Sequence, residues 1–169
     1  IAVDGILYTS TSFGRVAAID GFTGEQLWLF DSRSWEAGRP PNLGYNHRGV
    51  SYWSDGETQR ILMPTNDAYL YAIDAKTGRL DPAFGDAGRV DLAQGLGREI
   101  DRSQYSMISA PLITGDIVVV GSSIHDGPQN KEAPPGHVRG FNVRTGEQVW
   151  MFHTIPQRGE FGNDTWEEK

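Results

Sequence analysis

"AAIDGFTGEQLWLF", residues 17–30, is the stretch that decides the fold, because the chain contains three versions of it. The second version is "YAIDAKTGRLDPAFG" (71–85), and the third is "RGFNVRTGEQVWMF" (139–152). Each version places Asp or Asn shortly before a Thr-Gly pair, and the first and third versions continue to a Trp. The second version lacks this Trp and reads "GRLDP" instead. A pattern that recurs at fixed positions indicates a repeated structural unit.

The spacing of the three versions favours a β-propeller. The anchor residues Asp20, Asp74 and Asn142 lie about 54 and 68 residues apart, which is the range of a propeller blade with several strands. We expect each anchor side chain to accept hydrogen bonds from backbone amides of its turn. The glycines are expected to supply the positive φ of a tight hairpin: Gly24, Gly78 and Gly146.

Tryptophan follows the Thr-Gly pair in two of the three versions. Trp28 and Trp150 are expected on the outermost strand of their blades, where a large flat side chain packs against a neighbouring blade. The alternative interpretation is three ordinary hairpins in a sandwich. At about 40–50 residues per blade, the chain holds about three blades, whereas propellers close with about four to eight. The chain is therefore expected to be part of a longer protein or to assemble with other chains.

The remaining apolar segments also indicate an all-β chain. They are short, rich in β-branched and aromatic residues, and bounded by turn residues. The predicted strands lie at 6–12, 16–20, 25–30, 49–54, 60–64, 68–74, 116–123 and 147–152. Segments 31–47, 81–105 and 124–137 are predicted to be long loops, with a short helical turn near 92–100.

Composition excludes several classes of function. The net charge of −7 argues against a nucleic-acid partner, since phosphate binding needs clustered Lys and Arg. No run of about 18 apolar residues is present to span a membrane. The absence of Cys excludes disulfides and thiolate metal sites. The chain opens on Ile, and we interpret it as a processed chain or an internal piece.

Four motifs together resemble the quinoprotein dehydrogenases, eight-bladed propellers that hold pyrroloquinoline quinone. The first motif is "A-x-D-x-x-T-G-x-x-x-W" of the repeat. The others are "NHRGVSYW" (46–53), "VVVGSSIHDG" (118–127) and "APPGHVRGFNVRTGEQVWMFHTIPQRGEFGNDTW" (133–166). The resemblance covers nearly the whole chain and is strongest to the glucose and polyol branch. It implies that residues 1–169 are a fragment of such a propeller, with about three four-stranded blades.

The resemblance also implies a site with pyrroloquinoline quinone and calcium. Arg48 matches an arginine that would bond the quinone oxygens or a cofactor carboxylate. Ser123, with Ser122 beside it, matches a serine that donates to a cofactor carboxylate, and Asp126 matches a carboxylate ligand of calcium. The alternatives are a surface arginine in a salt bridge, a strand-end turn rich in Ser, and a solvated aspartate.

Three departures from the family pattern qualify this expectation. Ile108 stands where relatives carry a Thr, and Ser109 or Ser106 could substitute for that hydroxyl. "NL" at 42–43 replaces a vicinal disulfide of the alcohol-oxidising branch, which favours a sugar or polyol substrate. The catalytic base of the family is expected beyond Lys169. His153 and Glu160 lie in a predicted connecting loop, so we assign no catalytic residue and expect no turnover from this chain alone.

The implied function is oxidation of an aldose, polyol or other alcohol, with electrons passed to a quinone or cytochrome. The resemblance places the enzyme in the periplasm, where segments outside this chain could attach it to the inner membrane. A rival function is a non-catalytic propeller scaffold that binds protein partners. A second rival is a structural fragment without any cofactor.

Overall fold

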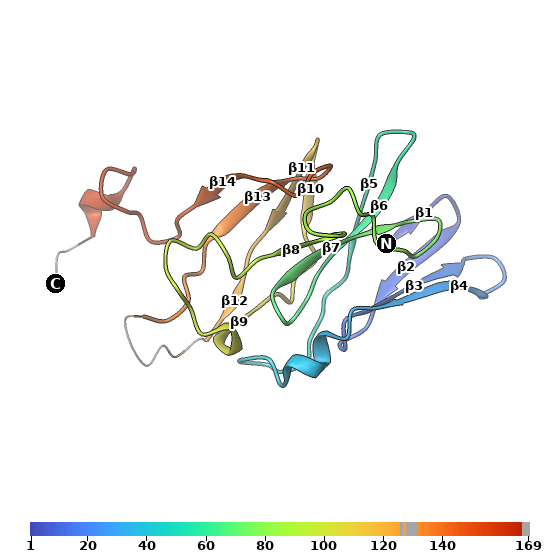
Figure 1. Ribbon diagram of the computed structural model, residues 1–169, viewed down its shortest axis with the longest axis horizontal. Coiled ribbons are helices and arrows are strands. Elements are labelled where there is room, and N and C mark those ends of the chain that lie inside the picture. Colours follow the sequence, from blue (N-terminus) through green and yellow to red (C-terminus); the bar gives the residue numbers. More distant parts are fainter. Residues whose placement is uncertain (126, 128–131, 167–169) are drawn as a thin grey trace.

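The computed structural model describes residues 1–125, 127 and 132–166, and within them the fold is all-β (Figure 1). The strands of these residues form three four-stranded antiparallel sheets and one two-stranded pair. The three sheets follow one another along the chain and do not close into a ring (Figure 1). This confirms the predicted partial propeller. No helix in this part of the chain is long and apolar enough to cross a membrane.

Each large sheet is a blade whose strands follow one another in chain order. The first blade contains β1 (Ala2–Val3), β2 (Ile6–Ser10), β3 (Arg15–Asp20) and β4 (Gln26–Asp31). The second contains β5 (Ser51–Ser54), β6 (Gln59–Pro64), β7 (Tyr69–Asp74) and β8 (Arg89–Asp91). The third contains β10 (Leu112–Thr114), β11 (Ile117–Val120), β13 (Val138–Asn142) and β14 (Gln148–Phe152).

Short elements connect the blades. β9 (Tyr105–Ser106) pairs with β12 (Ser123–Ile124) beside the third blade. Three 3-10 helices are described: η1 (Ser34–Ala37), η2 (Arg102–Gln104) and η3 (Asn163–Thr165). The helical turn predicted near 92–100 is wrong, because that segment consists of turns and bends and η2 begins only after it.

The repeated turns have the predicted chemistry. Asp20 Oδ1 accepts hydrogen bonds from the backbone N–H groups of Phe22 and Thr23, both at 2.8 Å. Asp74 and Asn142 bind the backbone of their own turns in the same way. The three glycines have φ of 74°, 71° and 77° in chain order. Each turn is therefore fixed by an anchor side chain and a left-handed glycine.

Trp28 joins the first blade to the second. It lies on β4, the outer strand of its blade, and its Nε1–H donates to Ala75 O at 3.0 Å. Its ring covers Gly78, where a Cβ would lie 2.7 Å from the indole. The hydroxyl of Tyr8 also donates to Ala75 O, at 3.2 Å. Gly78 is therefore needed both for its positive φ and for the close approach of Trp28.

The second repeat lacks a Trp, and the long segment 81–92, an excursion of the chain, contacts the third blade instead. The backbone N–H of Gly85 donates to Thr145 O at 2.8 Å. A Cβ on Gly146 would lie 2.8 Å from both Gly85 N and Val90 Cγ2. The excursion at 81–92, which contains β8, thus covers the turn of the third blade as Trp28 covers the turn of the second. This explains why the repeat changes to "GRLDP" at this point.

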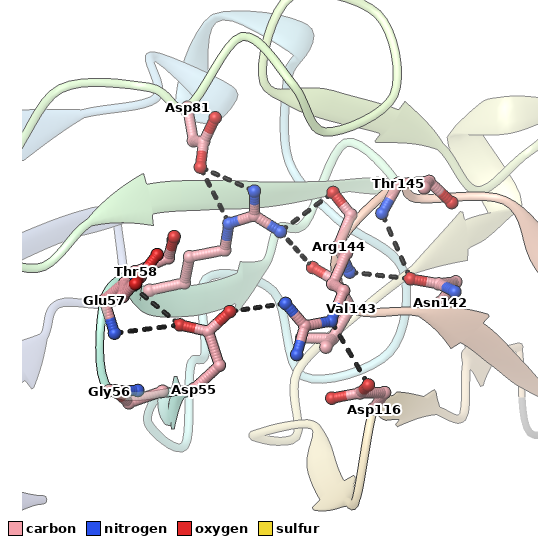
Figure 2. Close-up of polar contacts among 12 residues, drawn as sticks. Asp55, Gly56, Glu57, Thr58, Asp81, Asp116, Asn142, Val143, Arg144 and Thr145 are labelled. Carbon is pink, nitrogen blue, oxygen red and sulfur yellow. Dashed lines mark hydrogen bonds and ion pairs between the residues drawn. The ribbon is translucent and has the colours of Figure 1, made fainter.

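Charged side chains connect the same two blades near these turns. Arg60 on β6 is buried; it donates to Asp81 Oδ2 from Nε at 2.8 Å and from Nη2 at 2.6 Å. It also donates to the backbone oxygens of Val143 and Arg144. Figure 2 shows Asp81 and the backbone of Val143 and Arg144 on different sides of the guanidinium that they share. It also shows two carboxylates bound to the Arg144 guanidinium: Asp55 and Asp116. A buried cation with several partners therefore spans the second and third blades.

The largest apolar core lies between the second and third blades. Its buried side chains include Leu62 and Leu70 of the second blade and Val118 and Phe141 of the third. Arg139 on β13 is also buried, and its guanidinium donates to Leu92 O and to Gln94 O. These bonds fix the irregular segment after β8, where most backbone groups have no sheet partner.

Candidate functional site

The loops at one end of the second and third blades meet around a cavity. Antiparallel pairing brings the start of β5 to the end of β6 and the start of β10 to the end of β11. Ser51 Oγ joins the two blades there by donating to Pro111 O. The cavity has a volume of about 270 Å³. It is lined by Pro64, Met107, Ile108, Ser109, Val120, Gly121, Ser122, Ser123 and Ile124.

Three of the serines predicted from sequence line this cavity together: Ser109, Ser122 and Ser123. Ser122 Oγ is buried and has no hydrogen-bond partner among the residues that the structure describes. Ser106 is fully buried, and its hydroxyl donates to Ser123 O at 3.5 Å. Of the two serines that sequence left open, only Ser109 therefore lies on the cavity wall. The serine hydroxyls can donate hydrogen bonds to an acidic ligand.

Arg48 contacts the wall of this serine-lined cavity (the serine cavity) through its backbone. Its backbone N–H donates to Ile108 O at 2.8 Å, and Ile108 is part of the cavity wall. The Arg48 side chain is exposed and does not line the cavity in this structure. The backbone of Arg48 thus contacts the wall that Ser123 also lines, and the cofactor role of the two side chains stays a prediction. A guanidinium that turned toward these hydroxyls would suit a ligand with carboxylate groups.

The predicted calcium ligand cannot be placed in this site. Asp126 lies outside the described residues. Among residues 1–125, 127 and 132–166, no three His, Asp or Glu side chains are grouped so that they could hold a metal ion. The polar side chains that line the cavity are those of Ser109, Ser122 and Ser123.

His47, to which no role was assigned from the sequence, lies next to the site. Its Nδ1 lies 2.8 Å from Ser10 Oγ, and its Nε2 lies 2.6 Å from Pro64 O. Burial lowers the pKa of His47, against the opposing effect of the bond to Pro64 O. A lone histidine carries little information in a sequence, but its position directly before Arg48 was an available signal.

A second cavity adjoins the first at Ile124, which lines both. It has a volume of about 570 Å³, and His137 and His153 are part of its wall. The two imidazole rings meet edge to face with centroids 4.6 Å apart, and His153 Nδ1 lies 2.6 Å from Glu160 Oε1. Burial, then the neighbouring His153, lowers the pKa of His137. His153 and Glu160 lie beyond β14, as the predicted connecting loop required, and neither lines the serine cavity.

Comparison with known proteins connects this geometry to a family. The model of the pyrroloquinoline quinone (PQQ) family described as "Glucose/ethanol/alcohol dehydrogenase, beta-propeller domain" matches residues 1–169. A quinoprotein glucose dehydrogenase of Gluconobacter oxydans is 32% identical over 169 residues, covering 90% of this chain and 20% of that protein. The quinoprotein glucose dehydrogenase of Escherichia coli is 32% identical over 166 residues, with 90% and 20% covered.

Solved structures agree with these relatives. Quinohemoprotein alcohol dehydrogenase from Comamonas testosteroni matches with a TM-score of 0.70 and 25% identity, over 92% of this chain and 20% of that chain. BamB from Moraxella catarrhalis matches over 91% of this chain and 34% of that chain, with a TM-score of 0.53 and 20% identity, a likeness of fold alone. The chain spans about a fifth of the length of the curated relatives that it matches.

Proposed function

Because this chain belongs to the family of PQQ-dependent glucose, ethanol and alcohol dehydrogenase β-propeller domains, we propose that it forms three blades of such an enzyme. The whole enzyme would be an eight-bladed propeller, and residues 1–169 would be one continuous section of it. The observation that carries the proposal is the serine cavity at the blade ends. It contains the buried hydroxyl of Ser122, which has no hydrogen-bond partner among the described residues, and the Arg48 backbone bonds its wall.

The donor groups of the cavity fit the acid groups of PQQ. We propose that Ser109, Ser122 and Ser123 donate hydrogen bonds to cofactor carboxylates, and that Arg48 supplies a positive charge to its oxygens. When bound, the quinone would accept the hydride equivalent removed from the alcohol. The residues of this chain would hold and orient it, and the apolar side chains of Met107 and Val120 would keep water from one side of the cavity. Asp126 is proposed as an oxygen ligand of calcium.

The proposed substrate and electron acceptor are supported by the names of proteins similar to this chain. Glucose and glycerol dehydrogenases are among the proteins similar to this chain, which supports an aldose or polyol as substrate. One relative is named an alcohol dehydrogenase (quinone), which supports a quinone as electron acceptor, with a cytochrome as the alternative. We assign no catalytic base among residues 1–169. We further propose a periplasmic enzyme in which the other blades complete the site.

Equilibrium dialysis of the intact protein against PQQ and Ca²⁺ tests this function. Arg48→Ala and Ser122→Ala should each weaken quinone uptake by about tenfold or more, because a hydrogen bond to a charged group contributes about 1.5–3 kcal/mol. Ser54→Ala is the matched control, since Ser54 ends β5 at the opposite end of the blade. If the wild-type protein takes up no quinone, the dehydrogenase function is wrong and a scaffold role becomes the better account. Unchanged uptake by both site variants would refute the assigned cavity.

A further inference from the structure

His47 connects the first two blades at the wall of the serine cavity. It lies in the segment between β4 and β5, directly before Arg48. One imidazole nitrogen contacts Ser10 Oγ at the end of β2, and the other contacts Pro64 O at the end of β6. Pro64 lines the serine cavity. The two contacts are 2.8 Å and 2.6 Å long, which is the length of good hydrogen bonds.

The partners of His47 assign its tautomer. A carbonyl oxygen only accepts hydrogen bonds, so the contact with Pro64 O places the ring proton on Nε2. The backbone N–H of Gly49 points at Nδ1 at 3.4 Å and can only donate, so Nδ1 is unprotonated and accepts. Ser10 then donates to the same nitrogen. The neutral imidazole thus satisfies donors and acceptors on two blades at once, and burial favours this neutral form.

The segment around His47 also contacts the segment between β9 and β10 that leads into the third blade. The backbone N–H of Arg48 donates to Ile108 O, and the hydroxyl of Ser51 donates to Pro111 O. Gly49 between them has φ of 121°, and a Cβ there would lie 3.7 Å from Ala110 Cβ. The backbone that carries Arg48 is therefore bound to the first and second blades through His47, and to the segment before β10 through the next residues. The Arg48 side chain remains exposed.

We propose that His47 is a positioning residue of the quinone site: it sets the place of Arg48 and of the Pro64 wall by bonding both blades through one imidazole. The inference rests on the proposed function, because it assumes that Arg48 and the serine cavity bind the cofactor. His47 touches no ligand in this account. It acts through the backbone of Arg48 and through Pro64, and a guanidinium held at the correct place binds a carboxylate more tightly than a displaced one.

The test measures quinone affinity and stability separately in the intact protein. PQQ dissociation constants in Ca²⁺ buffer are determined by dialysis, and unfolding of the quinone-free protein is followed in urea. His47→Leu removes both bonds and should weaken quinone binding at least tenfold. His47→Gln keeps a donor for Pro64 O and should recover most of the affinity. Ser10→Ala removes only the bond to the first blade and should weaken binding about fivefold, which keeps the test available if His47→Leu does not fold.

Arg60→Met is the control for a merely structural effect. Arg60 lies near the start of β6, at the other end of the second blade, and does not line the cavity. The Arg60→Met variant should be less stable than wild type, as His47→Leu is, but its quinone dissociation constant should stay within about twofold of wild type. Wild-type affinity in His47→Leu, or in Ser10→Ala, would overturn the inference and leave the proposed function intact. Absence of quinone uptake by the wild-type protein would overturn the proposed function itself.

Discussion

Replacement of Gly78 by Ala tests how the first blade contacts the second. Gly78 has φ of 71°, so Ala would adopt a left-handed conformation that costs about 1–2 kcal/mol. The new Cβ would also lie 2.7 Å from the Trp28 ring, and such overpacking typically costs about 1–3 kcal/mol. Gly78→Ala should therefore reduce the free energy of unfolding by about 2–5 kcal/mol, measured by urea denaturation of the intact protein.

A double-mutant cycle with Trp28→Ala separates the two costs. Without the indole, the steric cost disappears and only the backbone cost of Gly78→Ala remains, so the coupling should be about 1–3 kcal/mol. Gly24→Ala is the matched control, because Gly24 has φ of 74° and, apart from its two chain neighbours, none of the described residues has an atom within 4 Å of its missing Cβ. Equal effects of Gly78→Ala and Gly24→Ala, together with zero coupling to Trp28→Ala, would refute the contact between these blades.

Three further predictions concern charge. Arg60→Met should cost about 3 kcal/mol in the free energy of unfolding, because it leaves the carboxylate of Asp81, whose side chain is 18% exposed, without its cationic partner. The double variant Arg60→Met with Asp81→Leu should recover part of this loss. No recovery in urea denaturation would contradict a charge effect. Burial lowers the pKa of His47 and of His137, so the unfolded chain binds protons first and stability should fall as pH decreases below about 6.5. His47→Gln should flatten this fall in urea denaturation between about pH 6.5 and 5, and a profile identical to wild type would refute the contribution of His47. Asp55, with a pKa of about 2 caused mainly by the backbone N–H of Thr58 and then by Arg144, should extend the loss of stability to lower pH.

The repeat made much of the fold predictable from sequence. The turn anchors and glycines act locally, within a few residues, so that Asp20 and Gly24 could be assigned roles from spacing alone. The strand β8 was missed inside the predicted loop 81–105, because it has only three residues and pairs with β7 across a long excursion. The bond from Arg60 to Val143 spans 83 residues and leaves no local pattern. Contacts between blades are therefore the part that sequence reasoning could not supply.

The candidate site shows the same division between local and distant information. Ser122 and Ser123 could be chosen from sequence because they end an apolar run. The choice between Ser106 and Ser109 depended on the pairing of β9 with β12, which turns Ser106 into the interior. His47 was overlooked because its partners, Ser10 and Pro64, belong to different blades.

The most direct test of the central claim is a crystal structure of the intact protein with PQQ and Ca²⁺. The account predicts carboxylate oxygens of the quinone within about 3 Å of the hydroxyls that line the serine cavity, and the Arg48 guanidinium turned toward the cofactor. A quinone bound elsewhere, with the hydroxyls of Ser109, Ser122 and Ser123 making no contact to it, would contradict the account.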